Sequence, residues 1–191
     1  MIEVVEYQPP WSARFTELRT AYGAALRATG VGYRSIEHVG STSVPGLAAK
    51  PIIDVDVVVE ASDAEQAARA LSHIGFEARG DLGVPGRIAF FTPERFAPSN
   101  TYVMTDGSLA LRNHLAVRDV LRADSALRDE YAAVKRQAAR SAGNPGEYLV
   151  LKSSVLDKIL RRAGLSAEER AEVAEVNCSI AARGVRGVRG G

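Results

Sequence analysis

The sequence predicts an α+β protein in which helices flank a mixed β-sheet and a helical C-terminal region follows. Two observations support this prediction. Within residues 1–107, short runs of β-branched and aromatic residues alternate with helical patterns and with turns rich in glycine and proline. From residue 108 onward, apolar residues recur at the three- and four-residue spacing of helices. We therefore expect an α/β core at 1–107, a helical region packed on it at 108–183, and a disordered glycine/arginine tail at 184–191.

In the first half, a helix should follow Pro9 and Pro10, because the apolar residues from Trp11 to Leu26 have helical spacing. A second helix should begin at a capping box formed by Ser62 and Glu65. The expected strands are Ser35–Val39, Ile52–Val59, Phe76–Arg79, Arg87–Thr92 and Thr101–Met104. In the second half, a capping box of Ser166 and Glu169 should open the last helix. The helices expected there are Leu109–Arg122, Ala126–Arg140, Tyr148–Ala163 and Glu168–Ala182.

Composition narrows the classes of partner. The formal net charge is +1, so no global field draws the chain to nucleic acid or to a membrane surface. No apolar run approaches the roughly 20 residues that cross a bilayer, and Cys178 is the only cysteine. The glycine/arginine tail has no aromatic residue to stack on bases. We expect a cytoplasmic protein with neither a membrane nor a nucleic-acid partner.

Two acids in the second predicted strand raise the question of function. Side chains alternate along a strand, so Asp54 and Asp56 share one face while Ile53, Val55 and Val57 share the other. Two carboxylates at this spacing can hold one hard divalent cation, for which Mg²⁺ is the best candidate. Alternatively, both acids face solvent on a half-exposed sheet.

The turn before that strand favours the metal interpretation. Gly40 permits close backbone approach, and Ser41, Thr42 and Ser43 supply hydroxyl groups. Backbone N–H groups at such a turn can bind a phosphate group. A phosphate-binding turn beside a carboxylate pair is the arrangement that nucleotidyl and phosphoryl transfer require.

These motifs resemble a known family. The stretch "EHVGSTSVPGLAAKPIIDVDVVV" is similar to the GrpB-like family, and so are "HLAVRDVLRAD", "YAAVKRQAA" and "YLVLKSSVLDKIL". The order of Gly-Ser and then Asp-x-Asp also resembles the nucleotidyltransferase superfamily with its polymerase-beta-like fold. The resemblance implies phosphate contacts at Gly40 and Ser41, and metal binding and catalysis at Asp54 and Asp56. A nucleotide or another phosphate-containing small molecule would be the ligand, and the acceptor is undefined.

The sequence departs from the superfamily at one position. Nucleotidyltransferases usually add a third carboxylate from a later strand, whereas the later strands here carry Asn100 and Tyr102. The acids nearest to those strands in sequence are Asp81 and Glu94, both in turn-like segments. Two functions therefore remain open: a magnesium-dependent nucleotidyltransferase, and a phosphate-binding module without catalysis. A third carboxylate beside the aspartate pair would favour the enzyme.

Basic residues form a second candidate group. Arg118, Lys135 and Lys152 lie on or beside the apolar stripes of three successive helices, where an unpaired charge would be costly. Together with Lys50 and Thr42 they could contact a polyanion over the aspartate strand. Alternatively, their aliphatic stems are buried and their charged ends reach water or a nearby acid. The three histidines lack metal-ligand spacing; a structural role is expected for His73 and His114, while His38 could either orient the turn or be a structural histidine.

Overall fold

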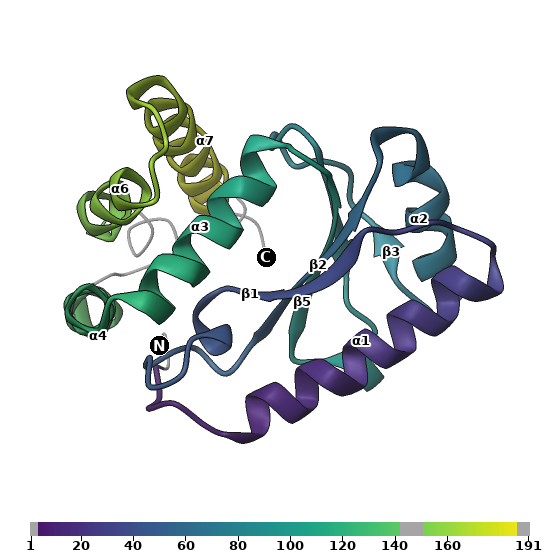
Figure 1. The fold of residues 1–191 in the computed structure, drawn as a ribbon, viewed down its shortest axis with the longest axis horizontal. Helices are drawn as coiled ribbons and strands as arrows, with labels where there is room; N and C mark the ends of the chain where they lie inside the picture. The colour runs from purple at the N-terminus through teal and green to yellow at the C-terminus, as the bar shows by residue number, and fades with distance from the viewer. Residues whose placement is uncertain (1–3, 142–150, 187–191) are drawn as a thin grey trace.

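The computed structural model describes residues 4–141 and 151–186. Its centre is a five-stranded sheet with the order β1-β2-β5-β4-β3 (Figure 1), in which β2 and β5 are parallel and the other pairs are antiparallel. The strands are β1 (Ser35–Val39), β2 (Ile53–Val59), β3 (Glu77–Ala78), β4 (Arg87–Phe91) and β5 (Ser99–Thr105). The predicted mixed α+β architecture is therefore confirmed.

One face of the sheet packs on helices α1 (Pro10–Ala28) and α2 (Ala64–Ser72). The alternating residues Ile53, Val55 and Val57 of β2 are buried there against Leu18, Leu26 and other apolar side chains. Because side chains alternate, this packing turns Asp54 and Asp56 to the opposite face.

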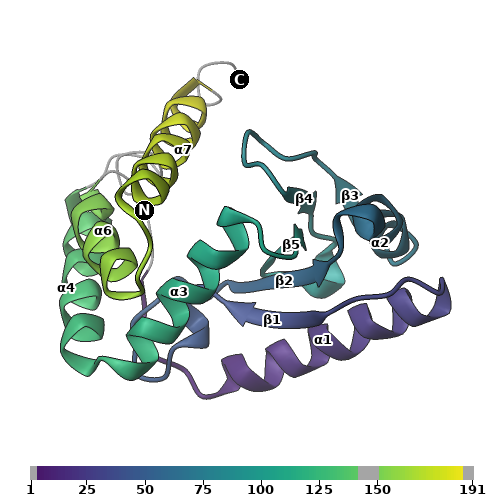
Figure 2. The same ribbon diagram turned by 45° about the horizontal axis from the view of Figure 1, so that its top comes forward.

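Helix α3 (Leu109–Ala123) crosses that opposite face, as Figures 1 and 2 show. Leu111 of α3 packs with Val58 of β2 and Met104 of β5 in a small apolar cluster. The remaining helices lie beside α3 and contact it or each other: α4 (Ser125–Ser141), α6 (Ser153–Arg162) and α7 (Ala167–Arg186).

Most predicted element boundaries agree with the structure to within a few residues, and of the two expected capping boxes one is present and one is not. The capping box at Ser166 and Glu169 is present, with each side chain accepting from the other residue's backbone N–H. The one expected at Ser62 and Glu65 is wrong, because a short 3₁₀ turn (Ala61–Asp63) precedes α2 and no side chain caps that helix. Tyr148 and the rest of 142–150 lie outside the described residues, as do 187–191. No described helix is long and apolar enough to cross a membrane.

Candidate functional site

The Gly-Ser turn packs directly on the aspartate strand. Gly40 has φ 66° and ψ −172°, a conformation open essentially to glycine alone. A Cβ atom at this position would lie 2.1 Å from Oδ2 of Asp54. A 3₁₀ turn over residues 41–43 follows, in which the Ser43 hydroxyl donates to the Gly40 carbonyl (2.6 Å). The glycine therefore brings the turn and the carboxylate into contact.

Hydrogen bonds of His38 and Thr42 hold the turn in place. Nε2 of His38 lies 3.1 Å from Oγ1 of Thr42, whose hydroxyl donates to the Ile52 carbonyl. The His38 ring also stacks on Phe15, with centroids 4.7 Å apart. Burial and the nearby arginine charges lower the pKa of His38 to about 4. His38 is thus a neutral residue that orients the turn, which is one of the two roles that the sequence left open.

Asp54 lies between the turn and β5. Asn100 is its neighbour in the parallel strand register, and Nδ2 of Asn100 donates to Oδ1 of Asp54 (2.8 Å). Burial raises the pKa of Asp54, although this hydrogen bond acts in the opposite direction. A cation close to the carboxylate would favour its ionised form.

Three lysines gather near Asp54. Lys135 from α4 is 3% exposed and donates from Nζ to the Ala48 carbonyl (2.8 Å). Burial and the charge of Lys152 lower the pKa of Lys135 to about 7, with Asp54 opposing the shift. The same two causes lower the pKa of Lys50.

These groups line one cavity of about 180 Å³, which we call the Asp54 cavity. Its walls are formed by Ser41, Thr42, Lys50, Ile52, Asp54, Asn100, Lys135 and Lys152. Six of the nine candidate residues from the sequence are in this set, and Gly40 contacts it through Asp54. Residues from the turn, β2, β5, α4 and the start of α6 thus meet at one place.

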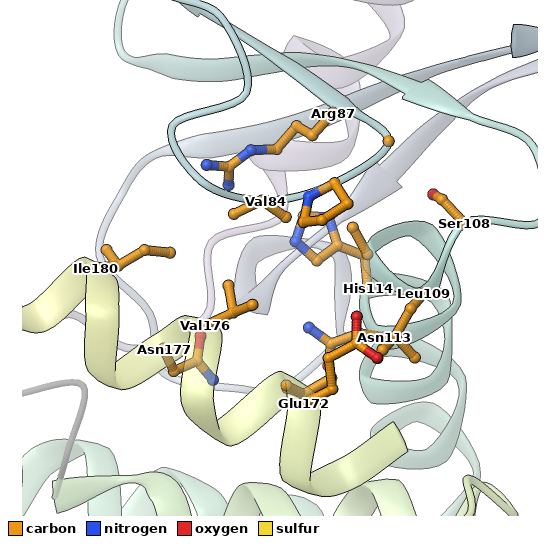
Figure 3. Close-up of a pocket in the computed structure, with 14 residues that line it drawn as sticks. Val84, Arg87, Ser108, Leu109, Asn113, His114, Glu172, Val176, Asn177 and Ile180 are labelled. Carbon is orange, nitrogen blue, oxygen red and sulfur yellow. The ribbon is translucent and has the colours of Figure 1, made fainter. Parts of the chain in front are cut away.

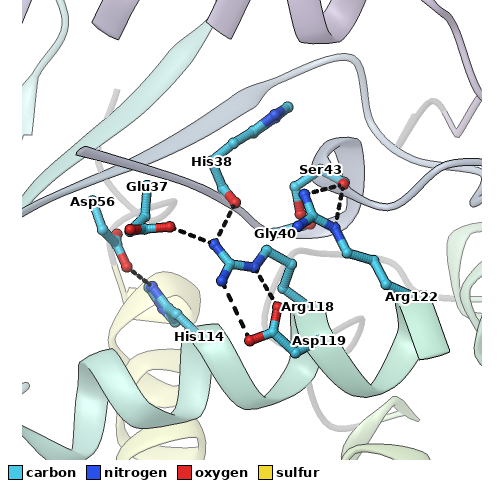
Figure 4. Close-up of polar contacts among 9 residues, drawn as sticks. All are labelled: Glu37, His38, Gly40, Ser43, Asp56, His114, Arg118, Asp119 and Arg122. Carbon is cyan, nitrogen blue, oxygen red and sulfur yellow. Dashed lines mark hydrogen bonds and ion pairs between the residues drawn. The ribbon is translucent and has the colours of Figure 1, made fainter. Parts of the chain in front are cut away.

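Asp56 lies deeper on the same face and pairs with a residue that the sequence did not single out. Its side chain is fully buried, and Oδ2 lies 2.8 Å from Nδ1 of His114 on α3 (Figure 4). Oδ1 of Asp56 is buried without a hydrogen-bond partner among the described residues. Burial lowers the pKa of His114, but the charge and hydrogen bond of Asp56 outweigh it and the net shift is upward.

Arg118 lies outside the cavity lining. Its guanidinium donates to Glu37 (2.6 Å) and to Asp119 (2.7 Å), and it contacts the His38 carbonyl (Figure 4). Pairing with a nearby acid was one of the two alternatives drawn from the sequence. Arg122, one turn later, donates twice to the Ser43 carbonyl and so ties α3 to the turn. These arginines hold the site together from α3.

The position of a third carboxylate is occupied by other side chains. Asn100 faces Asp54 and Tyr102 faces Asp56 in the register of β5. Asp81 lies in the β3–β4 loop, where Oδ1 accepts from the Gly83 N–H (2.7 Å), and Glu94 begins a 3₁₀ turn. Among the residues that the structure describes, no three acidic, histidine or cysteine side chains form a metal-binding group.

Comparison with known proteins identifies the family. The family model described as GrpB protein matches residues 1–162. The chain belongs to the GrpB family. A GrpB-family relative from Streptomyces coelicolor, UPF0157 protein SCO7215, is 36% identical over 85% of this chain and 84% of its own. The Bacillus subtilis relative, UPF0157 protein YqkA, is 32% identical over 72% of this chain, which spans only 40% of YqkA.

Solved structures support the fold. Conserved protein GrpB from Enterococcus faecalis superposes with a TM-score of 0.72 at 32% identity, covering 84% of this chain and 96% of that chain. The Cid1 poly(U) polymerase bound to MgGTP superposes with a TM-score of 0.52 at 21% identity, covering 71% of this chain and 45% of that chain. The GrpB chain thus has the nucleotidyltransferase-like fold that the resemblance implied.

The sequence left two contributions to this GrpB site unrecognised. His114 was assigned a structural role, yet it contacts Asp56 across 58 positions of sequence. Its place on α3, four residues before Arg118, was the one available signal, since i and i+4 residues share a helix face. The sequence indicated only that Asn100 stands on a strand where a third carboxylate is usual, whereas in the structure it donates a hydrogen bond to Asp54.

Proposed function

We propose that this GrpB protein binds a nucleotide or a related phosphate ligand, together with Mg²⁺, in the Asp54 cavity. One observation carries the proposal: six of the nine residues to which the sequence-based interpretation assigned phosphate or metal contacts line a single cavity. The cavity joins three lysines to a carboxylate, so it presents positive charge for an anion and negative charge for a cation.

The lysines favour a polyanion. Burial, and then repulsion by the charge of Lys152, lower the pKa values of Lys50 and Lys135. A ligand with several phosphate charges would offset the repulsion. Such a ligand would also stabilise the folded state, because it would bind that state alone.

The carboxylates fit Mg²⁺. Asp54 and Asp56 share a face, Oδ1 of Asp56 is buried with no partner among the described residues, and burial raises the pKa of Asp54. A cation would give Oδ1 of Asp56 a partner and would favour the ionised form of the buried Asp54 carboxyl. Mg²⁺ is commonly held by one or two carboxylates, with its other positions filled by water and phosphate oxygens. When bound, it would neutralise phosphate charge.

Nucleotidyl transfer is the second candidate function, favoured by the fold shared with Cid1, which was solved with MgGTP. Asn100 argues against it. Where a third carboxylate would stand, the uncharged amide of Asn100 donates a hydrogen bond to Asp54 and adds no negative charge for a metal. Binding without transfer is therefore the function that the geometry supports best.

Calorimetric titration tests the proposal. ATP, CTP, GTP and UTP are titrated with and without Mg²⁺ into the wild type, the double variant Asp54→Ala/Asp56→Ala, and Asp129→Ala as a control at an exposed acid. We expect binding that requires Mg²⁺ and is lost only in the double variant. Absence of binding to every nucleotide would overturn the proposal. Release of pyrophosphate from any bound nucleotide would establish the second candidate instead.

A further inference from the structure

A second cavity is lined in part by His114, the residue that contacts Asp56. It occupies about 250 Å³ between the start of α3, helix α7 and the loop that joins β3 to β4 (Figure 3), and we call it the α7 cavity. Its walls are largely apolar, formed by Val84, Leu109, Val173, Val176 and Ile180. Burial of an apolar ligand surface against such walls is favourable by about 25 cal/mol per Å².

The same cavity carries a few polar groups. Asn113 lines it, and Oδ1 of Asn113 is buried without a hydrogen-bond partner among the described residues. Leu109 and Ala110 also line it, and they open α3, where the first N–H groups have no acceptor within the helix. The lining residues thus include one carrying an unpaired acceptor, Asn113, and two carrying potential donors, Leu109 and Ala110. A largely apolar pocket with a few convergent polar groups is the usual form of a small-molecule site.

The charges around the α7 cavity are balanced. Arg87 and Glu172 have opposite signs, and His114 is paired with Asp56. This differs from the Asp54 cavity, where three lysines surround one carboxylate. The volume is also below the roughly 300–1,000 Å³ typical of pockets for drug-sized ligands. Charge and size together select a small, uncharged molecule.

We propose that the α7 cavity binds a second small molecule, uncharged and mainly apolar, with an amide-like group that both donates and accepts a hydrogen bond. His114 belongs to this cavity and also contacts Asp56. A ligand there would therefore lie against the only described hydrogen-bond partner of the Asp56 side chain. That this small molecule binds together with a nucleotide rests on the proposed function. That it binds in the α7 cavity does not.

Benzamide is a suitable probe, because it joins an apolar ring to one amide, and benzoate is its charged counterpart of the same shape. The protein has three histidines, so the ring resonances can be followed individually by NMR. We expect benzamide to shift the His114 resonance saturably while leaving His73, beyond the end of α2, unchanged. Benzoate should bind at least tenfold more weakly. An unmoved His114 resonance, or equal affinity for benzoate, would overturn the proposal.

Matched variants on α7 locate the probe. Val176→Trp fills the cavity, whereas Ala174→Trp places the same ring on an exposed position of the helix. We expect the benzamide shift to vanish in the first and to persist in the second; persistence in both would overturn the assignment. Ile180→Trp provides a second filling variant should Val176→Trp fail to fold.

Calorimetry on the same proteins separates the two proposals. Nucleotide binding retained by Val176→Trp, with benzamide binding lost, supports two distinct sites. Benzamide binding in a wild type that binds no nucleotide would uphold the α7 cavity and overturn only the proposed function of the Asp54 cavity.

Discussion

Gly40 and Asp54 approach so closely that the smallest side chain at residue 40 would overlap the carboxylate. The hypothetical Cβ atom would lie 2.1 Å from Oδ2 and 2.8 Å from Cγ of Asp54. The backbone of Gly40 is also in a region that other residues avoid, with φ 66° and ψ −172°. The spacing between the Gly-Ser turn and the Asp54 carboxylate therefore depends on the absence of a side chain at residue 40.

Gly40→Ala should lower both stability and ligand binding. Backbone strain of this kind costs about 1–3 kcal/mol, and displacement of Asp54 adds to it. Gly30→Ala is the matched control, because its φ is also positive, at 70°, and nothing lies within 4 Å of the added Cβ. Urea unfolding and nucleotide calorimetry should show a larger loss for Gly40→Ala; equal losses would mean that the contact with Asp54 is unimportant.

Lys135→Met should stabilise the ligand-free protein while weakening nucleotide binding. A lysine whose folded pKa is about 7 loses protonation on folding, so its burial opposes folding at neutral pH. Methionine fills similar space without charge, although the Ala48 carbonyl loses its donor, at about 1 kcal/mol. We expect the free energy of unfolding to rise by about 1 kcal/mol or more at pH 7.

Thermal and urea unfolding measure this change, with Lys158→Met as the control at an exposed lysine that pairs with Glu130. A destabilised Lys135→Met protein would show that the lysine contributes to folding rather than to ligand binding.

The lowered pKa of Lys135 also predicts a pH dependence of nucleotide affinity. An anion binds the protonated lysine better, so affinity should fall as pH rises through about 7. The phosphate groups of the ligand titrate too, and the difference between wild type and Lys135→Met removes that contribution. Calorimetry from pH 6 to 9 should show a steeper decline for the wild type. Parallel profiles would exclude Lys135 as the titrating group.

The sequence predicted which residues form the candidate site better than it predicted which side chains contact one another there. Alternation along β2 placed Asp54 and Asp56 on one face, because the period of two is a local property of the strand. The partnership of Asp56 with His114 depends on how α3 crosses the sheet, and no local pattern encodes that crossing. Arg118 shows the same limit, since its charge was evident but its partner Glu37 lies 81 residues away.

Arg118→Met should reduce stability and leave nucleotide affinity nearly unchanged. The Arg118 side chain is 13% exposed and its partner Glu37 28%, so their hydrogen-bonded ion pair is partly shielded from water. Such charged hydrogen bonds contribute about 1.5–3 kcal/mol. A double-mutant cycle with Glu37→Gln isolates the pair. A large loss of nucleotide affinity at unchanged stability would instead place Arg118 in contact with the ligand.

The contributions of His38 and His114 to the free energy of unfolding should change in opposite directions as pH rises. The folded pKa of His38, about 4, lies below the unfolded value of about 6.5. Its contribution is therefore present above pH 6.5 and declines by about 3 kcal/mol as pH falls to 4. The pKa of His114 is raised, so its contribution is complete below about pH 6.5 and is lost as pH rises through the folded value.

Glutamine variants separate these two contributions, since glutamine keeps a hydrogen-bonding side chain that does not titrate. Between pH 6.5 and 4, His38→Gln should lose less stability than the wild type, because it lacks the proton uptake that favours unfolding. His114→Gln should show its largest deficit at acid pH and approach the wild type as pH rises, because the wild type then loses the ion pair with Asp56 that the variant lacks at every pH. Urea unfolding across this range, with EDTA present to exclude metal, measures both slopes. The same sign of change in both variants would contradict the opposite charge states that their surroundings impose: Phe15 and two arginines around His38, and the buried Asp56 carboxylate at His114.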